Sequence, residues 1–275
     1  MSQPHGLRSA RARGAQLARG LACIWAIAVN TVRESVRSKL LYGLLFFAVL
    51  MIGSGAVVAS LSYVEGDRIL QDVGMGSVRL FGVAIAILVG INLIHREVDR
   101  RTVYTILSKP LSRGEFLVGK FLGLTLTIWL QMAIMGVAFV GVSLATGAPL
   151  GAPHLVFFFL AGVELALVVA IATFFSAFTT PVLAAFFTTG VWGVGHLSRQ
   201  LRDLGAASQS SPFEWATWLL HRVLPDLESF NLASEAAHLL PVTASDWVLP
   251  ALYGAGYLTL VLFAAVAVFE RRDLR

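Results

Sequence analysis

The longest uncharged stretch of the chain is residues 121–163, which read FLGLTLTIWLQMAIMGVAFVGVSLATGAPLGAPHLVFFFLAGV. These 43 residues far exceed the roughly 20 that a helix needs to cross a bilayer. Inside the stretch, the glycines and prolines of TGAPLGAP at residues 146–153 are typical of a tight turn. The stretch therefore predicts two membrane spans, one over about residues 121–145 and one that starts at His154.

Four more apolar runs predict further spans on either side. They cover residues 40–64, 78–94, 181–197 and 247–269, of which 78–94 is short and contains one charge. Pro181 separates the fifth span from the fourth, which ends near Phe178, because proline removes a backbone donor and clashes with the preceding helical turn. Arg79 stands at the start of the second span, where we expect its long side chain to snorkel to the interface.

The composition agrees with membrane residence. Apolar residues make up 57% of the chain, charged residues 13%, and the mean hydropathy is +0.76, whereas a soluble domain carries about a quarter charged residues. The apolar runs are continuous and lack the alternation of a lipid-facing barrel strand. Cys23 is a single cysteine, which excludes an intrachain disulfide and a thiolate metal cluster.

The distribution of lysine and arginine predicts the orientation. Seven basic residues lie in residues 1–39, six in residues 95–120 and three after the last span, whereas residues 198–246 hold three bases against six acids. Basic loops stay in the cytoplasm, so both termini are predicted inside, with residues 198–246 as an external helical cap. A re-entrant pair over residues 154–197 would leave this orientation unchanged.

The N-terminal region is predicted as a disordered basic tail, residues 1–20, followed by an amphipathic elbow helix, residues 21–39. On a helical wheel Trp25, Val29 and Val32 share an apolar stripe opposite Arg33 and other polar residues, as in a helix lying in the membrane interface. Two other interpretations are open, a targeting peptide and a cytoplasmic extension of the first span.

The sequence offers little catalytic chemistry. It contains no nucleotide-binding P-loop, no zinc-protease or serine-hydrolase motif, and its six histidines lack ligand spacing. We therefore predict no catalytic residue and no metal site. Glu164 is an acid inside the fourth span, and it is a candidate either for the transport path or for a structural hydrogen bond between helices. His196 is predicted to lie at the interface.

The cytoplasmic segment of residues 95–120, HREVDRRTVYTILSKPLSRGEFLVGK, is the most distinctive part of the chain. Pro110 divides it into two short predicted helices, and Ser112 with Glu115 forms a predicted capping box. The first helix has an apolar side and a basic side, which fits docking of a cytosolic protein; a solvated positive loop is the alternative.

This segment resembles the permeases of type-2 ABC exporters, the ABC-2 family. The residues that match the family pattern in order are Glu97, Thr102, Leu107, Ser108, Pro110, Ser112, Arg113, Gly119 and Lys120. The resemblance implies that the segment carries a coupling helix that docks on an ATP-binding subunit, and that an elbow helix precedes the first span. LPDLESFNL at residues 224–232 and the terminal FERRDLR look like the branch linked to copper-enzyme maturation, notably of nitrous-oxide reductase.

We therefore predict an all-α, polytopic protein in which residues 40–275 form a six-span transmembrane domain with a coupling helix between spans 2 and 3. It would be the permease subunit of an ATP-driven transporter in the bacterial inner membrane, paired with a second permease copy and two separate ATPase subunits that hold ATP and Mg²⁺, while this chain binds no cofactor. The residues expected to couple to the ATPase are Glu97, Arg100, Arg101, Thr102, Tyr104, Leu107, Ser108, Pro110, Ser112, Arg113 and Lys120. A membrane scaffold that docks a cytosolic partner and a proton-coupled carrier that uses Glu164 are the alternatives.

Overall fold

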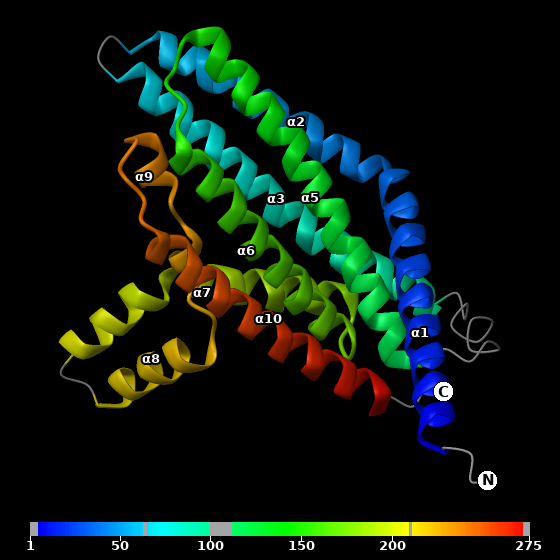
Figure 1. Cartoon of the computed structure of the whole chain (residues 1–275). Helices are drawn as coiled ribbons and strands as arrows, with labels where there is room; N and C mark the ends of the chain where they lie inside the picture. The colour runs from blue at the N-terminus through cyan, green and yellow to red at the C-terminus, as the bar shows by residue number, and fades with distance from the viewer. Residues whose placement is uncertain (1–4, 63–64, 100–111, 209–210, 272–275) are drawn as a thin grey trace.

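A computed structural model describes residues 5–62, 65–99, 112–208 and 211–271. Within this part of the chain the secondary structure is helical (Figure 1). The helices, in chain order, are α1 (His5–Val36), α2 (Lys39–Ser60), α3 (Gly66–Asp99), α5 (Arg113–Thr146), α6 (Ala152–Ser176), α7 (Pro181–Ala207), α8 (Ser211–Val223), the 3-10 turn η1 (Glu228–Phe230), α9 (Ala233–Ala237) and α10 (Ala244–Arg271).

Five of the described helices are long and apolar enough to cross a membrane: α2, α3 over Gly66–Ile91, α5, α6 and α10. Helix α7, which contains the predicted fifth span, is not among them. Its uncharged part, residues 181–198, contains two threonines, three glycines and His196, which make it less apolar than the other five helices, and its last third is charged. The chain is thus a multi-pass helical membrane protein, as predicted.

The predicted helix breaks at residues 146–153 and at Pro181 are confirmed. Helix α5 ends at Gly147, which adopts a left-handed conformation with φ of 78°, and α6 has Pro153 in its first turn. Proline is also the first residue of α7, where its missing N–H costs nothing. The glycine and proline signals therefore gave the correct places for these two turns.

The N-terminal region differs from the prediction at its start. Helix α1 begins at His5, so residues 5–20 lie in the helix instead of a disordered tail. Ten of these sixteen residues are alanine, arginine or leucine, which have high helix propensity. The prediction of disorder relied on their charge and did not take this propensity into account. Helix α1 ends at Val36 and α2 begins at Lys39, close to the predicted boundary between the elbow and the first span.

Helix α6 is the centre of the bundle. Of the residues in its most apolar stretch, 72% are buried inside the protein, against 22% for the corresponding stretches of α2 and α10. It packs against α3, α5, α7 and α10. A large apolar core joins α3, α5 and α6 through residues such as Ile85, Leu124 and Val168, and this core surrounds the middle of α6.

Two ends of the bundle can be recognised. At one end the Gln71 amide donates to the Pro149 carbonyl, which joins α3 to the turn between α5 and α6, and α9 lies nearby (Figure 1). At the other end Phe116 of α5 packs with Ala177, which follows α6, and with Phe269 of α10. Helix α1 lies at this second end. The first part of α7 packs against α6 and α3. Its last part lies beside α8, and both project from the bundle (Figure 1).

Candidate functional site

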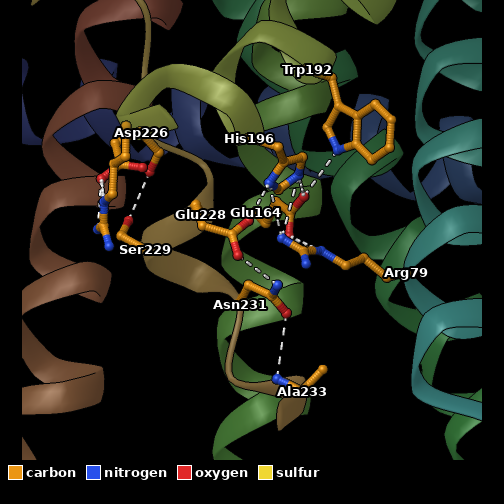
Figure 2. A network of polar contacts seen from close by, with 10 residues as sticks. Arg79, Glu164, Trp192, His196, Asp226, Glu228, Ser229, Asn231 and Ala233 are labelled. Carbon is orange, nitrogen blue, oxygen red and sulfur yellow. Dashed lines mark hydrogen bonds and ion pairs between the residues drawn. The ribbon is translucent and has the colours of Figure 1, made fainter. Parts of the chain in front are cut away.

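Glu164 lies in the middle of α6 and is completely buried, with 0% of its surface exposed. Its Oε2 accepts a hydrogen bond from Nε of Arg79 at 2.9 Å, and its Oε1 accepts one from the indole N–H of Trp192 at 3.0 Å. Nε2 of His196 also lies 3.0 Å from Oε1. A buried carboxylate is costly unless it is paired and hydrogen-bonded, and these three partners meet that requirement (Figure 2).

Arg79 reaches Glu164 from α3. Its side chain is only 15% exposed, so the expectation that it snorkels to the interface is wrong. The physical reason is that Glu164 lies within reach inside the bundle, and an ion pair in a medium of low dielectric is much stronger than one in water. Arg79 thus joins α3 to α6 at the depth of Glu164.

Trp192 and His196 lie four residues apart on α7 and therefore on the same helix face. Their rings are in contact, with centroids 5.0 Å apart, and both point to Glu164. His196 is not the interfacial residue that the sequence predicted, because both of its ring nitrogens have carboxylate partners within the protein.

The second partner of His196 is Glu228, whose Oε2 lies 3.2 Å from Nδ1. Glu228 is the first residue of η1, which belongs to the predicted external segment 198–246. Its Oε1 accepts a hydrogen bond from the Asn231 side-chain amide at 2.9 Å. This segment therefore reaches the ion pair between α3 and α6 (Figure 2).

The backbone of this segment is fitted closely to the bundle. The Leu227 N–H donates to the Gly195 carbonyl, and a Cβ on Gly195 would lie 2.8 Å from Cγ of Leu227. A Cβ on Gly254 of α10 would likewise lie 2.9 Å from the ring of Phe230. Both glycines permit an approach that a larger residue would block.

Further polar contacts hold the segment on its outer side. Arg199 of α7 pairs with Asp226 at 2.7 Å, and the Asp226 N–H donates to the Tyr253 hydroxyl. The Tyr257 hydroxyl donates to the Val223 carbonyl. Together these contacts place residues 223–231 between α7 and α10.

We name the group Arg79, Glu164, Trp192, His196 and Glu228 the ion cluster. It unites two membrane helices, helix α7 and the segment that follows α8. Glu164 was a predicted candidate, whereas the other four were not predicted as site residues. The i, i+4 spacing of Trp192 and His196, and the opposite charges of Arg79 and Glu164 in two predicted spans, were signals that could have found three of them; nothing local marked Glu228.

Most of the predicted coupling residues lie outside the residues that the structure describes. These are Arg100, Arg101, Thr102, Tyr104, Leu107, Ser108 and Pro110. Glu97 lies near the end of α3, and its side chain is also outside the description. The structure therefore places only Ser112, Arg113 and Lys120 of the set by their contacts.

Ser112 and Glu115 form the predicted capping box, which is confirmed. The Ser112 hydroxyl accepts from the Glu115 N–H, and the Glu115 carboxylate accepts from the Ser112 N–H. The helix that they start is not short, however, because α5 continues without a break to Thr146. No proline interrupts this stretch, so the predicted second short helix is instead the first part of the third span.

Arg113 and Lys120 make contacts inside the chain. Arg113 donates to the Glu270 carbonyl at the end of α10. Lys120 is 2% exposed, lies 3.7 Å from Glu34 of α1 and sits over the Phe116 ring. Lys120 therefore links α5 to α1, and its burial leaves little of it for a partner protein.

Helix α1 is packed closely on this part of α5. A Cβ on Gly123 would lie 2.5 Å from Cβ of Thr31, and one on Gly119 would lie 2.9 Å from Cβ of Ile27. Two glycines four residues apart allow helix backbones to approach closely. Trp25 is 61% exposed on α1, away from this contact, which agrees with the predicted apolar stripe.

These observations define a class of protein, a multi-pass helical membrane protein with an ion cluster enclosed within its bundle. Comparison with known families supplies the particular group: the model of the family described as "ABC-2 family transporter protein" matches residues 25–274. The chain belongs to the ABC-2 transporter family, as the coupling segment indicated, and this family is a transport component that is not itself catalytic. A search of curated proteins found no match. The nitrous-oxide reductase branch stays a prediction.

Proposed function

We propose that this chain is the permease subunit of an ATP-driven ABC transporter in the bacterial inner membrane. In this proposal it forms the substrate path with a second permease copy, and two separate ATPase subunits bind ATP and Mg²⁺. The observation that carries the proposal is the family match over residues 25–274, together with an ion cluster that crosses from α3 to α6 and α7.

The proposed topology has six spans, with α7 as the fifth and both termini in the cytoplasm. Residues 181–198 of α7 carry no charge, and α7 begins just after α6 ends, which supports a hairpin of two spans. The basic segments 1–39 and 95–120 would then lie on the inside, with α8, η1 and α9 outside. Helix α1 would be the elbow helix, with Trp25 toward the headgroups.

We propose that residues 95–113 dock on the ATPase and that movement of this segment reaches the bundle through the start of α5. The support is the set of contacts at that place. Arg113 binds the end of α10, and Lys120 approaches Glu34 of α1. A displacement of the segment would therefore act on α1, α5 and α10 together, with Lys120 as a positioning residue inside the permease.

We further propose that the ion cluster is the polar centre of the substrate path. Glu164 is fully buried in this conformation, so transport requires that its surroundings open. The external segment carrying Glu228 supports this proposal, because it covers the cluster and contacts it through the single side chain of Glu228.

Two measurements test the proposal. Native mass spectrometry of the tagged chain purified from its own bacterium should show two copies together with two P-loop ATPase subunits; a purified complex without an ATPase would contradict the proposal.

In a variant without Cys23, a membrane-impermeant thiol reagent should label a cysteine at Ser208 from outside and should not label one at the C-terminus. Labelling of both positions from one side would contradict the six-span topology.

A further inference from the structure

Glu228 is more exposed than the other charged members of the ion cluster. Its side chain is 33% exposed, against 1% for Glu164, 15% for Arg79 and 16% for His196. It is carried by a three-residue 3-10 turn, whereas Arg79, Glu164 and His196 lie on long helices. Glu228 is therefore the outermost and most exposed charged member of the cluster.

The contacts of His196 determine how many protons the cluster holds. Nε2 faces a carboxylate oxygen of Glu164 at 3.0 Å, and Nδ1 faces one of Glu228 at 3.2 Å. Carboxylate oxygens only accept hydrogen bonds, so both contacts need a hydrogen on the nitrogen or on the carboxyl. A neutral imidazole has one N–H, which serves one of the two contacts. The other contact needs one added proton, held either by His196 or by one of the two carboxyl groups.

Arg79 does not change this count. Its Nη2 lies 3.3 Å from both ring nitrogens of His196. The lone pairs of the two nitrogens diverge, so an atom equidistant from both does not lie along either. Arg79 uses its Nε–H for Glu164 and contributes one positive charge beside the imidazole ring.

The charges of the cluster then sum to zero. Arg79 and the added proton contribute two positive charges, and the carboxylates of Glu164 and Glu228 contribute two negative ones. If Glu228 leaves as a carboxylate with its segment, the added proton stays with the other three groups, which then carry a net charge of plus one. A buried site with a net charge attracts a counter-ion strongly, so Glu228 acts as an anion supplied by the chain itself.

We propose that His196, with the positive charge of Arg79 beside its ring, forms a binding site for an anionic group, such as a carboxylate or phosphate, and that Glu228 occupies this site when the external segment is closed. Glu164 is held by three partners and remains in place to orient both cations. That the anionic group belongs to the transported molecule rests on the proposed function; the existence of the anion site does not.

Fluorescence quenching of Trp192 tests the site, because its indole N–H is bonded to Glu164. The other five tryptophans are replaced by phenylalanine, and the probe is iodide at constant ionic strength in a neutral detergent. Glu228→Gln should increase the iodide quenching constant of Trp192 about tenfold, because removal of one negative charge nearby raises the local anion concentration. Quenching by neutral acrylamide should change much less.

Two variants serve as controls. Glu214→Gln removes the same charge from an exposed position on α8 and should leave iodide quenching unchanged. Glu228→Gln combined with His196→Gln restores a neutral cluster and should abolish the increase. An equal rise with acrylamide, or an increase that persists in the double variant, would show a mere opening of the segment and would overturn the anion site.

Competition distinguishes the two sources of an anionic group. Inorganic phosphate or acetate should protect Trp192 of the Glu228→Gln variant from iodide if the site takes a soluble anion. Protection in nanodiscs with phosphatidylglycerol, compared with phosphatidylcholine alone, would assign the site to a lipid headgroup. If neither protects, the proposal is wrong.

A second measurement covers the case in which the tryptophan replacements unfold the protein. With all native tryptophans present, sulfate at constant ionic strength should raise the melting temperature of Glu228→Gln and should not raise that of the double variant. Equal shifts in both variants would overturn the site. None of these measurements needs an ATPase, so a failed transport assay and a failed anion site are distinguishable.

Discussion

Replacement of Arg79 by methionine measures how much the buried ion pair contributes to stability. Methionine keeps the apolar length of the side chain but leaves the Glu164 carboxylate, which is 0% exposed, without its closest cation. Removal of one partner from a buried pair costs about 3–5 kcal/mol. We expect about 3 kcal/mol, at the lower end, because His196 remains 3.0 Å from Glu164.

The same helix provides a matched control. Arg68 of α3 also pairs with a glutamate at 3.0 Å, but its side chain is 50% exposed and that of Glu65 is 58% exposed. An exposed pair contributes about 0–1 kcal/mol, so Arg68→Met should have little effect. Both variants remove the same type of side chain from α3. They differ in that the Arg79 pair is buried between two helices, whereas the Arg68 pair is local and exposed.

The assay is thermal unfolding of the purified chain in detergent. At about 2–4 °C per kcal/mol for a chain of this size, Arg79→Met should lower the melting temperature by about 6 °C or more. Adding Glu164→Leu should restore much of the loss, because an apolar pair can replace a buried ion pair at little cost. If Arg79→Met and Arg68→Met shift the melting temperature equally, the ion cluster is not enclosed as described.

Three further predictions follow from particular contacts. Glu164→Gln should fold and lose less stability than Arg79→Met, because Gln retains hydrogen bonding and the Arg79 left without its carboxylate is 15% exposed. Glu164→Leu should selectively lose transport if Glu164 lines the path, or lose stability and transport in proportion if it only packs; two stable and fully active variants would exclude both roles. Gly123→Leu should lower stability by about 1–3 kcal/mol through overpacking against α1, measured by thermal unfolding, whereas Gly141→Leu, whose Cβ would meet open space, should not. Ser112→Ala should lower stability by about 1 kcal/mol in the same assay because it removes the helix cap, and an unchanged melting temperature would show that the capping box contributes nothing.

The sequence predicted the helices well where local chemistry decides them. The glycines and prolines at residues 146–153 and Pro181 act on their own backbone, and Ser112 with Glu115 forms its cap within four residues. The start of α1 was missed because a charge-rich stretch was judged by its charge and not by its helix propensity. The fifth predicted span is not among the candidate membrane helices, because it is only moderately apolar and continues as one helix, α7, into a charged stretch.

The site was predictable only in part. Glu164 could be found because a charge in an apolar run is costly wherever the run packs. Its partners depend on tertiary structure: Arg79 is 85 residues away in sequence and His196 is 32 residues away. Glu228 lies in a segment of ordinary composition, and only the path of residues 223–231 between α7 and α10 brings it to the cluster.

ATP hydrolysis by the complex tests the central proposal, that this chain is the membrane subunit driven by a separate ATPase. The partner ATPase is assayed in lipid nanodiscs alone, with the wild-type chain, and with a variant that combines Arg100→Asp, Arg101→Asp and Leu107→Asp. We predict that the wild-type chain binds the ATPase and stimulates its rate, and that the triple variant loses both effects. An ATPase whose binding and rate are the same with the wild-type chain and the triple variant would contradict coupling through residues 95–113, and the absence of any ATPase that binds the chain would contradict the proposed function itself.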